Sequence, residues 1–350
     1  MAASNMAASN ERGRKISAII ACYKDAQAIP IMAERLTQTF RKIEVDYEII
    51  FVNDGSPDDT QAVLERLTAS DSHIKGITHS RNFGSQNAFT SGMKLATGDS
   101  CVLLDGDLQD PPELIADFYT KWLEGFDVVY GVRVKREMAP FWEFGYKAFY
   151  RLFQSVAYVR VPLDAGDFSL IDRSVMNVIN ALPERDRFLR GLRAWAGFKQ
   201  TGVPYVRPER MFGRSTNNLW SNIRWARKGI FSFSYVPLEL ISVGALVVSL
   251  LSLLAGIAQI VARIFWPHVP QGIPTIIVLS LFLGSIQLFS IAFLAEYVGK
   301  IFEEVKQRPQ FVVTKLLNFE APKADAPVAR AEREGRSALV ADRREVAGGE

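Results

Sequence analysis

Short β-branched runs alternate with helix-like segments along the chain up to about residue 210. The runs occupy residues 16–23, 47–54, 73–80, 100–107 and 127–133, and enough residues separate neighbouring runs for a helix to form between them. Strands that alternate with helical segments predict βαβ units and a mostly parallel sheet. We therefore expect an α/β fold for residues 16–210.

Two longer apolar runs follow this region. Residues 240–262 and 273–295 are each 23 residues long without a formal charge. A helix of that length spans about 34 Å, more than the ~30 Å hydrocarbon core of a bilayer. We predict two transmembrane helices within residues 236–298; two buried helices of a soluble core are the alternative.

Basic residues lie before the first apolar run and after the second, whereas the turn between the runs carries only Arg263 and His268. Positively charged loops remain on the cytoplasmic side of a membrane. We therefore expect a multi-pass protein of the cytoplasmic (inner) membrane, with the α/β domain and both termini in the cytoplasm.

Two further segments mix aromatic with basic residues. Residues 141–158 and 217–235 have the composition of amphipathic helices that lie in the headgroup plane, although packing against the sheet is the alternative. We assign the second segment to a juxtamembrane helix within 211–235. Residues 1–15 and most of 299–350 are polar, and we expect them to be largely disordered.

Carboxylates stand at the ends of three predicted strands. Asp25 follows the first predicted strand, Asp54 ends the second, and Asp105 and Asp107 end the fourth. Open α/β sheets bind ligands at the carboxyl ends of their strands. The Asp-x-Asp pair, with the Gln109 side chain two residues on, suits a hard divalent cation that also holds diphosphate oxygens. A solvated loop is the alternative for such a pair taken alone.

Overall charge and cysteines narrow the class of protein. The chain has 41 Lys and Arg against 38 Asp and Glu, a net charge of +3, so we expect no nucleic-acid partner. Cys22 and Cys101 lie in apolar strands without a metal-binding pattern, which predicts reduced core residues.

Five polar segments occur in a recognisable order: Ala21-Cys22-Tyr23-Lys24-Asp25, Asn53-Asp54-Gly55-Ser56, Arg81-Asn82-Phe83-Gly84, Asp105-Gly106-Asp107-Leu108-Gln109-Asp110-Pro111-Pro112 and Gly166-Asp167-Phe168. Together they resemble the polyprenyl-phosphate branch of glycosyltransferase family 2, which includes dolichol-phosphate mannose synthases and bactoprenol glucosyltransferases. The resemblance covers about residues 16–300. It implies a GT-A, Rossmann-like catalytic domain at 16–210.

The resemblance also implies roles for individual residues. The residues implied for nucleotide binding are Ala21, Tyr23, Asp25, Asp54, Arg81 and Asp105. The metal, Mg²⁺ or Mn²⁺, is implied to bind Asp105, Asp107 and Gln109, and the phosphates to lie near Arg210 and Arg214. Arg133 is a further candidate for the acceptor phosphate. The chain departs from the family at Asp25, where Glu is usual, at Gln86, where a basic residue is frequent, and at Thr216, where Lys is usual.

The implied reaction is an inverting transfer of one hexose from a nucleotide sugar to undecaprenyl or another polyprenyl phosphate. Asp107 and Asp167 are the implied catalytic residues. Because a phosphate monoester has its second pKa near ~6, the acceptor is already largely deprotonated at neutral pH. We therefore expect Asp167 mainly to orient a substrate, and base catalysis is its alternative role.

Several alternatives remain open from the sequence. UDP-glucose is the preferred donor, and UDP-N-acetylhexosamine, UDP-galactose and GDP-mannose are the others. A processive synthase is disfavoured because two spans are too few for a channel. A non-catalytic membrane scaffold is disfavoured by the intact Asp105/Asp107 pair. We also expect a homo-oligomer, because Gly244, Gly256 and Gly284 allow close approach of membrane helices.

Overall fold

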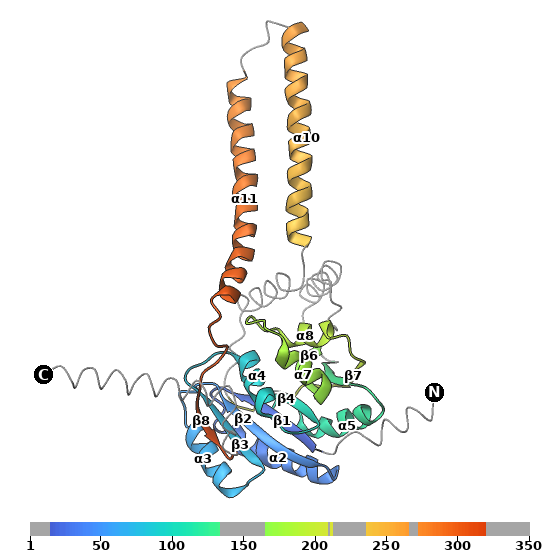
Figure 1. Ribbon diagram of the computed structural model, residues 1–350, viewed down its shortest axis with the longest axis vertical. Coiled ribbons are helices and arrows are strands. Elements are labelled where there is room, and N and C mark those ends of the chain that lie inside the picture. Colours follow the sequence, from blue (N-terminus) through green and yellow to red (C-terminus); the bar gives the residue numbers. More distant parts are fainter. Residues whose placement is uncertain (1–14, 134–164, 209–210, 213–235, 266–271, 320–350) are drawn as a thin grey trace, which may run out of the picture.

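The computed structural model describes residues 15–133, 165–208, 211–212, 236–265 and 272–319. An α/β domain forms one end of the molecule, and two long helices extend from it (Figure 1). The predicted interfacial segments 141–158 and 217–235 lie outside the described residues. Residues 1–14 and 320–350 do so too.

One eight-stranded sheet forms the centre of the domain, in the order β7-β5-β6-β4-β1-β2-β3-β8. Strands β6 and β8 run antiparallel to their neighbours, and the other pairs are parallel. All five predicted strands are confirmed, and the mostly parallel sheet with them. The strands are β1 (Lys15–Cys22), β2 (Asp46–Asn53), β3 (Ile74–His79), β4 (Ser100–Asp105), β5 (Val128–Arg133), β6 (Ala165–Asp172), β7 (Gln200–Tyr205) and β8 (Val313–Leu317).

Helices cover both faces of the sheet. The first face packs on α2 (Ala28–Lys42), α3 (Thr60–Ser70) and α5 (Ile115–Leu123), the last preceded by the 3₁₀ turn η1 (Pro112–Leu114). The opposite face packs on α4 (Ser85–Leu95), α7 (Arg173–Ala181) and α8 (Leu189–Trp195). Central strands are therefore apolar on both sides, as parallel sheets require. Cys22 and Cys101 are free and buried here, as predicted.

Strand register brings the predicted polar residues to one edge of the sheet. Ala21 at the end of β1 pairs with Asp105 at the end of β4, and Cys22 pairs with Asn53 at the end of β2. The chain then leaves all three strands on the same side. The fold thus gathers segments that are up to 84 residues apart, counted from Ala21 to Asp105.

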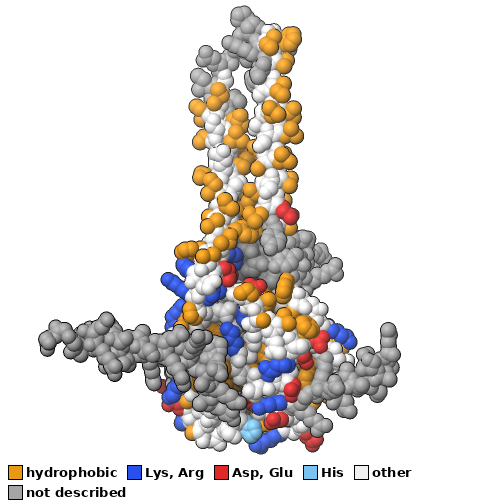
Figure 2. All heavy atoms as spheres, viewed as in Figure 1, with side chains coloured by type: hydrophobic (Ala, Val, Ile, Leu, Met, Phe, Trp, Pro, Cys, Tyr) orange, Lys and Arg blue, Asp and Glu red, His pale blue; other side chains and the backbone are white. Residues whose placement is uncertain are grey.

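The two long helices are α10 (Val236–Phe265) and α11 (Ile273–Val305). Each contains a stretch long and apolar enough to cross a membrane, Leu238–Ala258 with a mean hydropathy of 2.5 and Ile276–Val305 with 2.3. Apolar side chains cover their outer surface along most of its length (Figure 2). An apolar surface of this extent needs a partner other than water.

The segment after α11 differs from the sequence expectation. Residues 299–350 were expected to be largely disordered, but α11 continues to Val305 and β8 then pairs antiparallel with β3. Asn318 fixes the end of β8, because its amide donates to the carbonyl oxygens of Thr68, Asp71 and Ile74 at 2.5, 3.2 and 2.9 Å. The sheet therefore extends beyond the predicted 16–210 domain.

Helix α4 lies close to the sheet at Gly92. A Cβ atom added there would lie 2.3 Å from Cγ2 of Ile19 on β1, so only glycine allows this approach. We predict that Gly92→Ala costs about 1–3 kcal/mol of stability through overpacking. The expected readout is a lower thermal unfolding midpoint of the purified full chain.

The control for this prediction is a double-mutant cycle. Ile19→Ala alone costs about 2–5 kcal/mol by leaving a cavity. In the double variant the added methyl group occupies that space, so the combined loss should be smaller than the sum. Strict additivity would show that the Gly92 contact does not limit the approach of α4.

Candidate active site

The ends of β1, β2 and β4 form the floor of the site. Asp54 N donates to Cys22 O at 3.0 Å, and Gly106 N donates to Ala21 O at 2.9 Å. The turn after β1 is closed by Asp25, whose Oδ2 accepts a hydrogen bond from Tyr23 N at 2.9 Å. Tyr23 itself is 40% exposed beside this turn. A ring in that position is available to stack on a planar ligand.

Carboxylates crowd the neighbouring end of β4. Burial raises the pKa of Asp105 to about 7, and the negative charges of Asp110, Asp167 and Asp107 add to the effect. Asp110 is buried and accepts a hydrogen bond from the Tyr205 hydroxyl at 2.6 Å. The site therefore concentrates more negative charge than its apolar surroundings favour.

A tight turn orients the second carboxylate of the Asp-x-Asp pair. Leu108 adopts a left-handed backbone with φ 60°, and its side chain is buried in the core. Gln109 N donates to Asp107 Oδ1 at 3.1 Å, and the Gln109 amide donates to Pro208 O at 3.3 Å. A non-glycine residue held in this conformation costs about 1–3 kcal/mol and marks functional sites.

The donor chemistry of this cluster fits a divalent cation. Asp105 and Asp107 offer hard carboxylate oxygens, and the raised pKa of Asp105 indicates negative charge that a bound cation would relieve. Among the described residues no three His, Cys, Asp or Glu side chains are arranged as a complete metal site. Oxygens of a bound substrate would have to complete the coordination.

Arg207 lies beside the carboxylates, and its Nε–H makes no hydrogen bond to the described residues. Arg207 Nη2 lies 3.9 Å from Asp107 Oδ2, and Arg207 Nε lies 3.7 Å from Asp110 Oδ1. Both distances exceed hydrogen-bond length. The buried Nε–H has no hydrogen-bond partner within the described part of the chain. This group is placed to donate to an anionic ligand.

Asp167, at the start of β6, is held by two other elements. Arg190 on α8 contacts both of its oxygens, Nε to Oδ1 at 3.1 Å and Nη2 to Oδ2 at 3.3 Å. Gln86 on α4 donates to Oδ2 at 3.1 Å. Burial alone would raise the pKa of Asp167, but the charge and hydrogen bonds of Arg190, with Arg193 and Gln86, hold it below its usual value.

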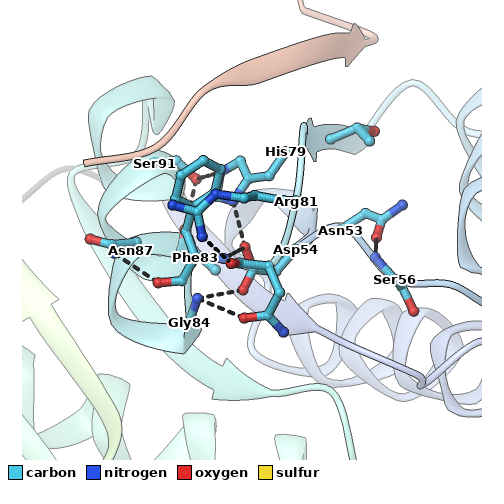
Figure 3. A network of polar contacts seen from close by, with 12 residues as sticks. Asn53, Asp54, Ser56, His79, Arg81, Phe83, Gly84, Asn87 and Ser91 are labelled. Carbon is cyan, nitrogen blue, oxygen red and sulfur yellow. Dashed lines mark hydrogen bonds and ion pairs between the residues drawn. The ribbon is translucent and has the colours of Figure 1, made fainter. Parts of the chain in front are cut away.

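Asp54 is engaged in a buried network (Figure 3). His79 Nδ1 lies 2.8 Å from Asp54 Oδ1, within hydrogen-bond distance. The backbone N–H groups of Phe83 and Gly84 donate to Asp54 at 2.9 and 2.7 Å. Asp54 thus fixes the loop at residues 80–84, whereas a direct contact from Asp54 to a nucleotide stays a prediction.

The same loop presents Arg81. Its guanidinium lies 4.1 Å from the centre of the Phe83 ring, and Nη1 donates to Asn82 O at 3.1 Å. Beside the loop is a pocket of about 510 Å³, lined by Arg81, Asn82, Phe83, Gly84, Asn87, Arg185, Glu303, Arg308, Pro309 and Gln310. The loop therefore faces both the sheet edge and the base of α11.

The arginines predicted near phosphate are only partly described. Arg133 ends β5, and its Nε donates to the Tyr205 hydroxyl at 3.3 Å, next to Asp110. Arg210 and Arg214 lie outside the described residues. The sequence analysis did not identify Arg190 or Arg207, because each comes from a segment whose approach to the carboxylates depends on tertiary packing.

Comparison with known proteins agrees with this geometry. The model of "Glycosyl transferase family 2" matches residues 17–179. An uncharacterized glycosyltransferase of Synechocystis is 39% identical over 308 residues, covering 87% of this chain and 96% of the relative. The SfII prophage-derived bactoprenol glucosyl transferase of Shigella flexneri is 35% identical over 309 residues, covering 86% of this chain and 98% of the relative.

Solved structures are more distant. Mannosyl-3-phosphoglycerate synthase from Rubrobacter xylanophilus is 17% identical, covers 69% of this chain and 78% of its own, and has a TM-score of 0.44. That similarity is too low to add to the assignment. The sequence relatives are decisive, since identity well above 30% extends over nearly their whole length. The chain belongs to glycosyl transferase family 2, together with these bactoprenol glucosyl transferases.

Proposed function

We propose that the chain transfers one hexose from a nucleotide sugar, preferably UDP-glucose, to polyprenyl phosphate at the cytoplasmic face of the inner membrane. The product would be a polyprenyl-phosphate-linked sugar for cell-surface glycans. The carboxylate cluster around Asp105 and Asp107 carries the proposal, because it lies in a domain anchored to two exposed apolar helices. Relatives named bactoprenol glucosyl transferases support the class of acceptor.

Asp105, Asp107 and Gln109 are the residues that would hold Mg²⁺ or Mn²⁺. When bound, the cation would act as a Lewis acid that offsets the charge of the leaving nucleoside diphosphate. The Leu108 turn fixes Asp107 relative to Gln109 before the donor arrives. Such preorganisation places the ligands without a cost at the moment of reaction.

Arg207 would add a cationic donor to the same leaving group. Its Nε–H is buried and lacks a hydrogen-bond partner within the described residues, and its guanidinium lies near Asp107. A buried donor without a partner is costly, so a ligand oxygen that accepts from it gains binding energy. Arg133, Arg210 and Arg214 remain the residues proposed for the phosphates.

Nucleotide binding is proposed for the opposite end of the site. Tyr23 and Arg81 offer an exposed ring and a guanidinium, while Asp25 and Asp54 shape the two turns that carry them. The sheet edge between these groups and Asp105 is continuous through the pairing of Ala21 with Asp105. A nucleoside diphosphate sugar would extend along it from base to metal.

Asp167 is proposed to orient rather than to remove a proton. Its low pKa, caused by Arg190 and Gln86, makes it a weak base. The acceptor phosphate, with a second pKa near ~6, has little need of one. Inversion of the anomeric carbon then follows from direct displacement by the phosphate oxygen. Placement and leaving-group stabilisation would dominate the catalysis.

Self-association is proposed through the membrane helices. At Gly244, Gly256 and Gly284 an added Cβ would meet nothing within 4 Å. Small residues on an open helix face let a second helix approach closely. These positions are therefore free for contact with another copy of the chain.

The direct test of the proposed function uses membranes that contain the protein and a panel of radiolabelled sugar nucleotides. Label from UDP-glucose is expected in the chloroform-soluble lipid when Mg²⁺ or Mn²⁺ is present. If the label enters the lipid from GDP-mannose, UDP-galactose or a UDP-N-acetylhexosamine instead, that sugar nucleotide is the donor. No transfer from any donor would favour a membrane scaffold.

A first prediction concerns the metal site. Asp107→Asn should lower transfer by ~10²-fold or more, because one of the two carboxylates that hold the cation is lost. Initial rates in Mg²⁺, in Mn²⁺ and after chelation provide the measurement. Asp117→Asn, on the exposed surface of α5, is the matched control and should behave as wild type. Full activity of Asp107→Asn would contradict the assignment.

A second prediction concerns Asp167. Asp167→Asn should slow transfer yet leave the shape of the pH–rate profile unchanged over roughly pH 6 to 9. In that range the acceptor phosphate, with a second pKa near ~6, is the group expected to shape the profile. The sign follows from the lowered pKa, which keeps Asp167 ionised throughout that range. Loss of a titrating limb in the variant, with both substrates still bound, would instead identify Asp167 as the base.

A further inference from the structure

The chain between α11 and β8, residues 306–312, returns from the apolar helix to the sheet, and we refer to it as the return linker. It runs beside the end of β3. Val312 O accepts a hydrogen bond from Ser80 N at 2.9 Å, and Thr314 Oγ1, in the strand β8 that follows, donates to Thr78 O at 3.1 Å. The return linker therefore reaches the sheet directly next to the loop at residues 80–84.

An aromatic contact joins the return linker to the buried network. The Phe311 ring stacks on the His79 imidazole with centroids 5.2 Å apart and planes 12° apart. The amine of Lys94 lies 5.2 Å from the centre of the same Phe311 ring. His79 is 2% exposed, so Phe311 closes its environment from the side of the return linker. Stacked rings contribute about 0.5–1.5 kcal/mol beyond their buried area.

His79 connects the Phe311 ring to Asp54. Its Nδ1 lies 2.8 Å from Asp54 Oδ1 and its Nε2 lies 3.0 Å from Ser91 Oγ, so both ring nitrogens are fixed (Figure 3). Asp54 in turn accepts from the N–H groups of Phe83 and Gly84. Hydrogen bonds in a buried network strengthen one another, so moving the ring disturbs the entire set.

The loop held by this network bears on the proposed donor site. It carries Arg81, and Gly84 leads into α4, whose Gln86 holds Asp167. On the side of α11 a pocket of about 510 Å³ separates the loop from Glu303 and Arg308. The return linker reaches the loop through the hydrogen bond from Ser80 N to Val312 O and through the Phe311–His79 contact.

We propose that Phe311 and His79 are positioning residues through which the return linker sets the loop at residues 80–84 for the nucleotide of the donor. This inference rests on the proposed function and adds to it. The segment that follows the membrane helices thereby becomes part of the donor site. Truncating the Phe311 ring should weaken donor binding and leave the acceptor reaction intact.

The test uses the full chain in membranes, with initial rates measured over donor and acceptor concentrations. Phe311→Ala should raise the donor KM about 3- to 10-fold, the range that a lost ring stack implies. Its kcat and acceptor KM should stay within about twofold of wild type. Phe311→Tyr keeps the ring and should restore the donor KM. Val312→Ala removes an exposed neighbouring side chain and is the matched control.

A double-mutant cycle distinguishes an effect of Phe311 that acts through His79 from a general loss of stability. If Phe311 acts through His79, the donor KM of the His79→Ala, Phe311→Ala double variant should equal that of His79→Ala alone. Independent, multiplicative effects would overturn the proposal. An unchanged donor KM in Phe311→Ala, or a loss of kcat alone, would overturn it as well.

Direct binding distinguishes failure of this inference from failure of the proposed function. Calorimetric titration of UDP with Mn²⁺ into the same full-length variants requires no acceptor and no turnover. Weaker binding by Phe311→Ala than by Val312→Ala supports the linkage even if no sugar transfer is found. Equal binding by these two variants rejects the linkage even if the wild type transfers sugar.

Discussion

The crowding of carboxylates at the end of β4 is the constraint on which the rest of the site depends. Asp105 lies among the charges of Asp107, Asp110 and Asp167, and burial and their repulsion raise its pKa to about 7. Among the described residues, Arg207 lies near Asp107, Arg133 acts on Asp110 and Arg190 contacts Asp167. The raised pKa of Asp105 shows that negative charge is unfavourable there, and a divalent cation would relieve it. The proposed binding of a sugar nucleotide with a cation rests on this arrangement of charge.

Different elements of the fold position the residues of the proposed site. The parallel strands bring Ala21, Asp54 and Asp105 to one edge, while α4 and α8 hold Asp167 from the opposite face. The apolar helices would keep the domain at the surface where a lipid phosphate is found. Their return to the sheet through β8 ties that anchoring segment to the loop at residues 80–84. The proposed membrane anchor and the proposed donor site are thus joined by the same strand pairing.

Much of this could be predicted from local sequence, and the remainder depends on tertiary contacts. The first five strands and the Asp105/Asp107 pair have clear local patterns, because buried parallel strands are continuously apolar and end in polar turns. Strand β8 has no such pattern, since a short antiparallel edge strand needs only a few half-buried side chains. Arg207 and Arg190 acquire a role only when folding brings them to the carboxylates. Asp54 was predicted to be a site residue, and its bonds to His79 and the loop could not be seen in the sequence.

The central claim is that the carboxylate cluster is completed by a cation and a nucleoside diphosphate together. The most direct test is an electron paramagnetic resonance titration of Mn²⁺ into the full-length protein, with and without UDP. The account predicts weak Mn²⁺ binding alone and tighter binding with UDP, with reciprocal tightening of UDP by Mn²⁺. Asp105→Asn should abolish this mutual effect. Equal Mn²⁺ affinity with and without UDP in the wild type would contradict the account.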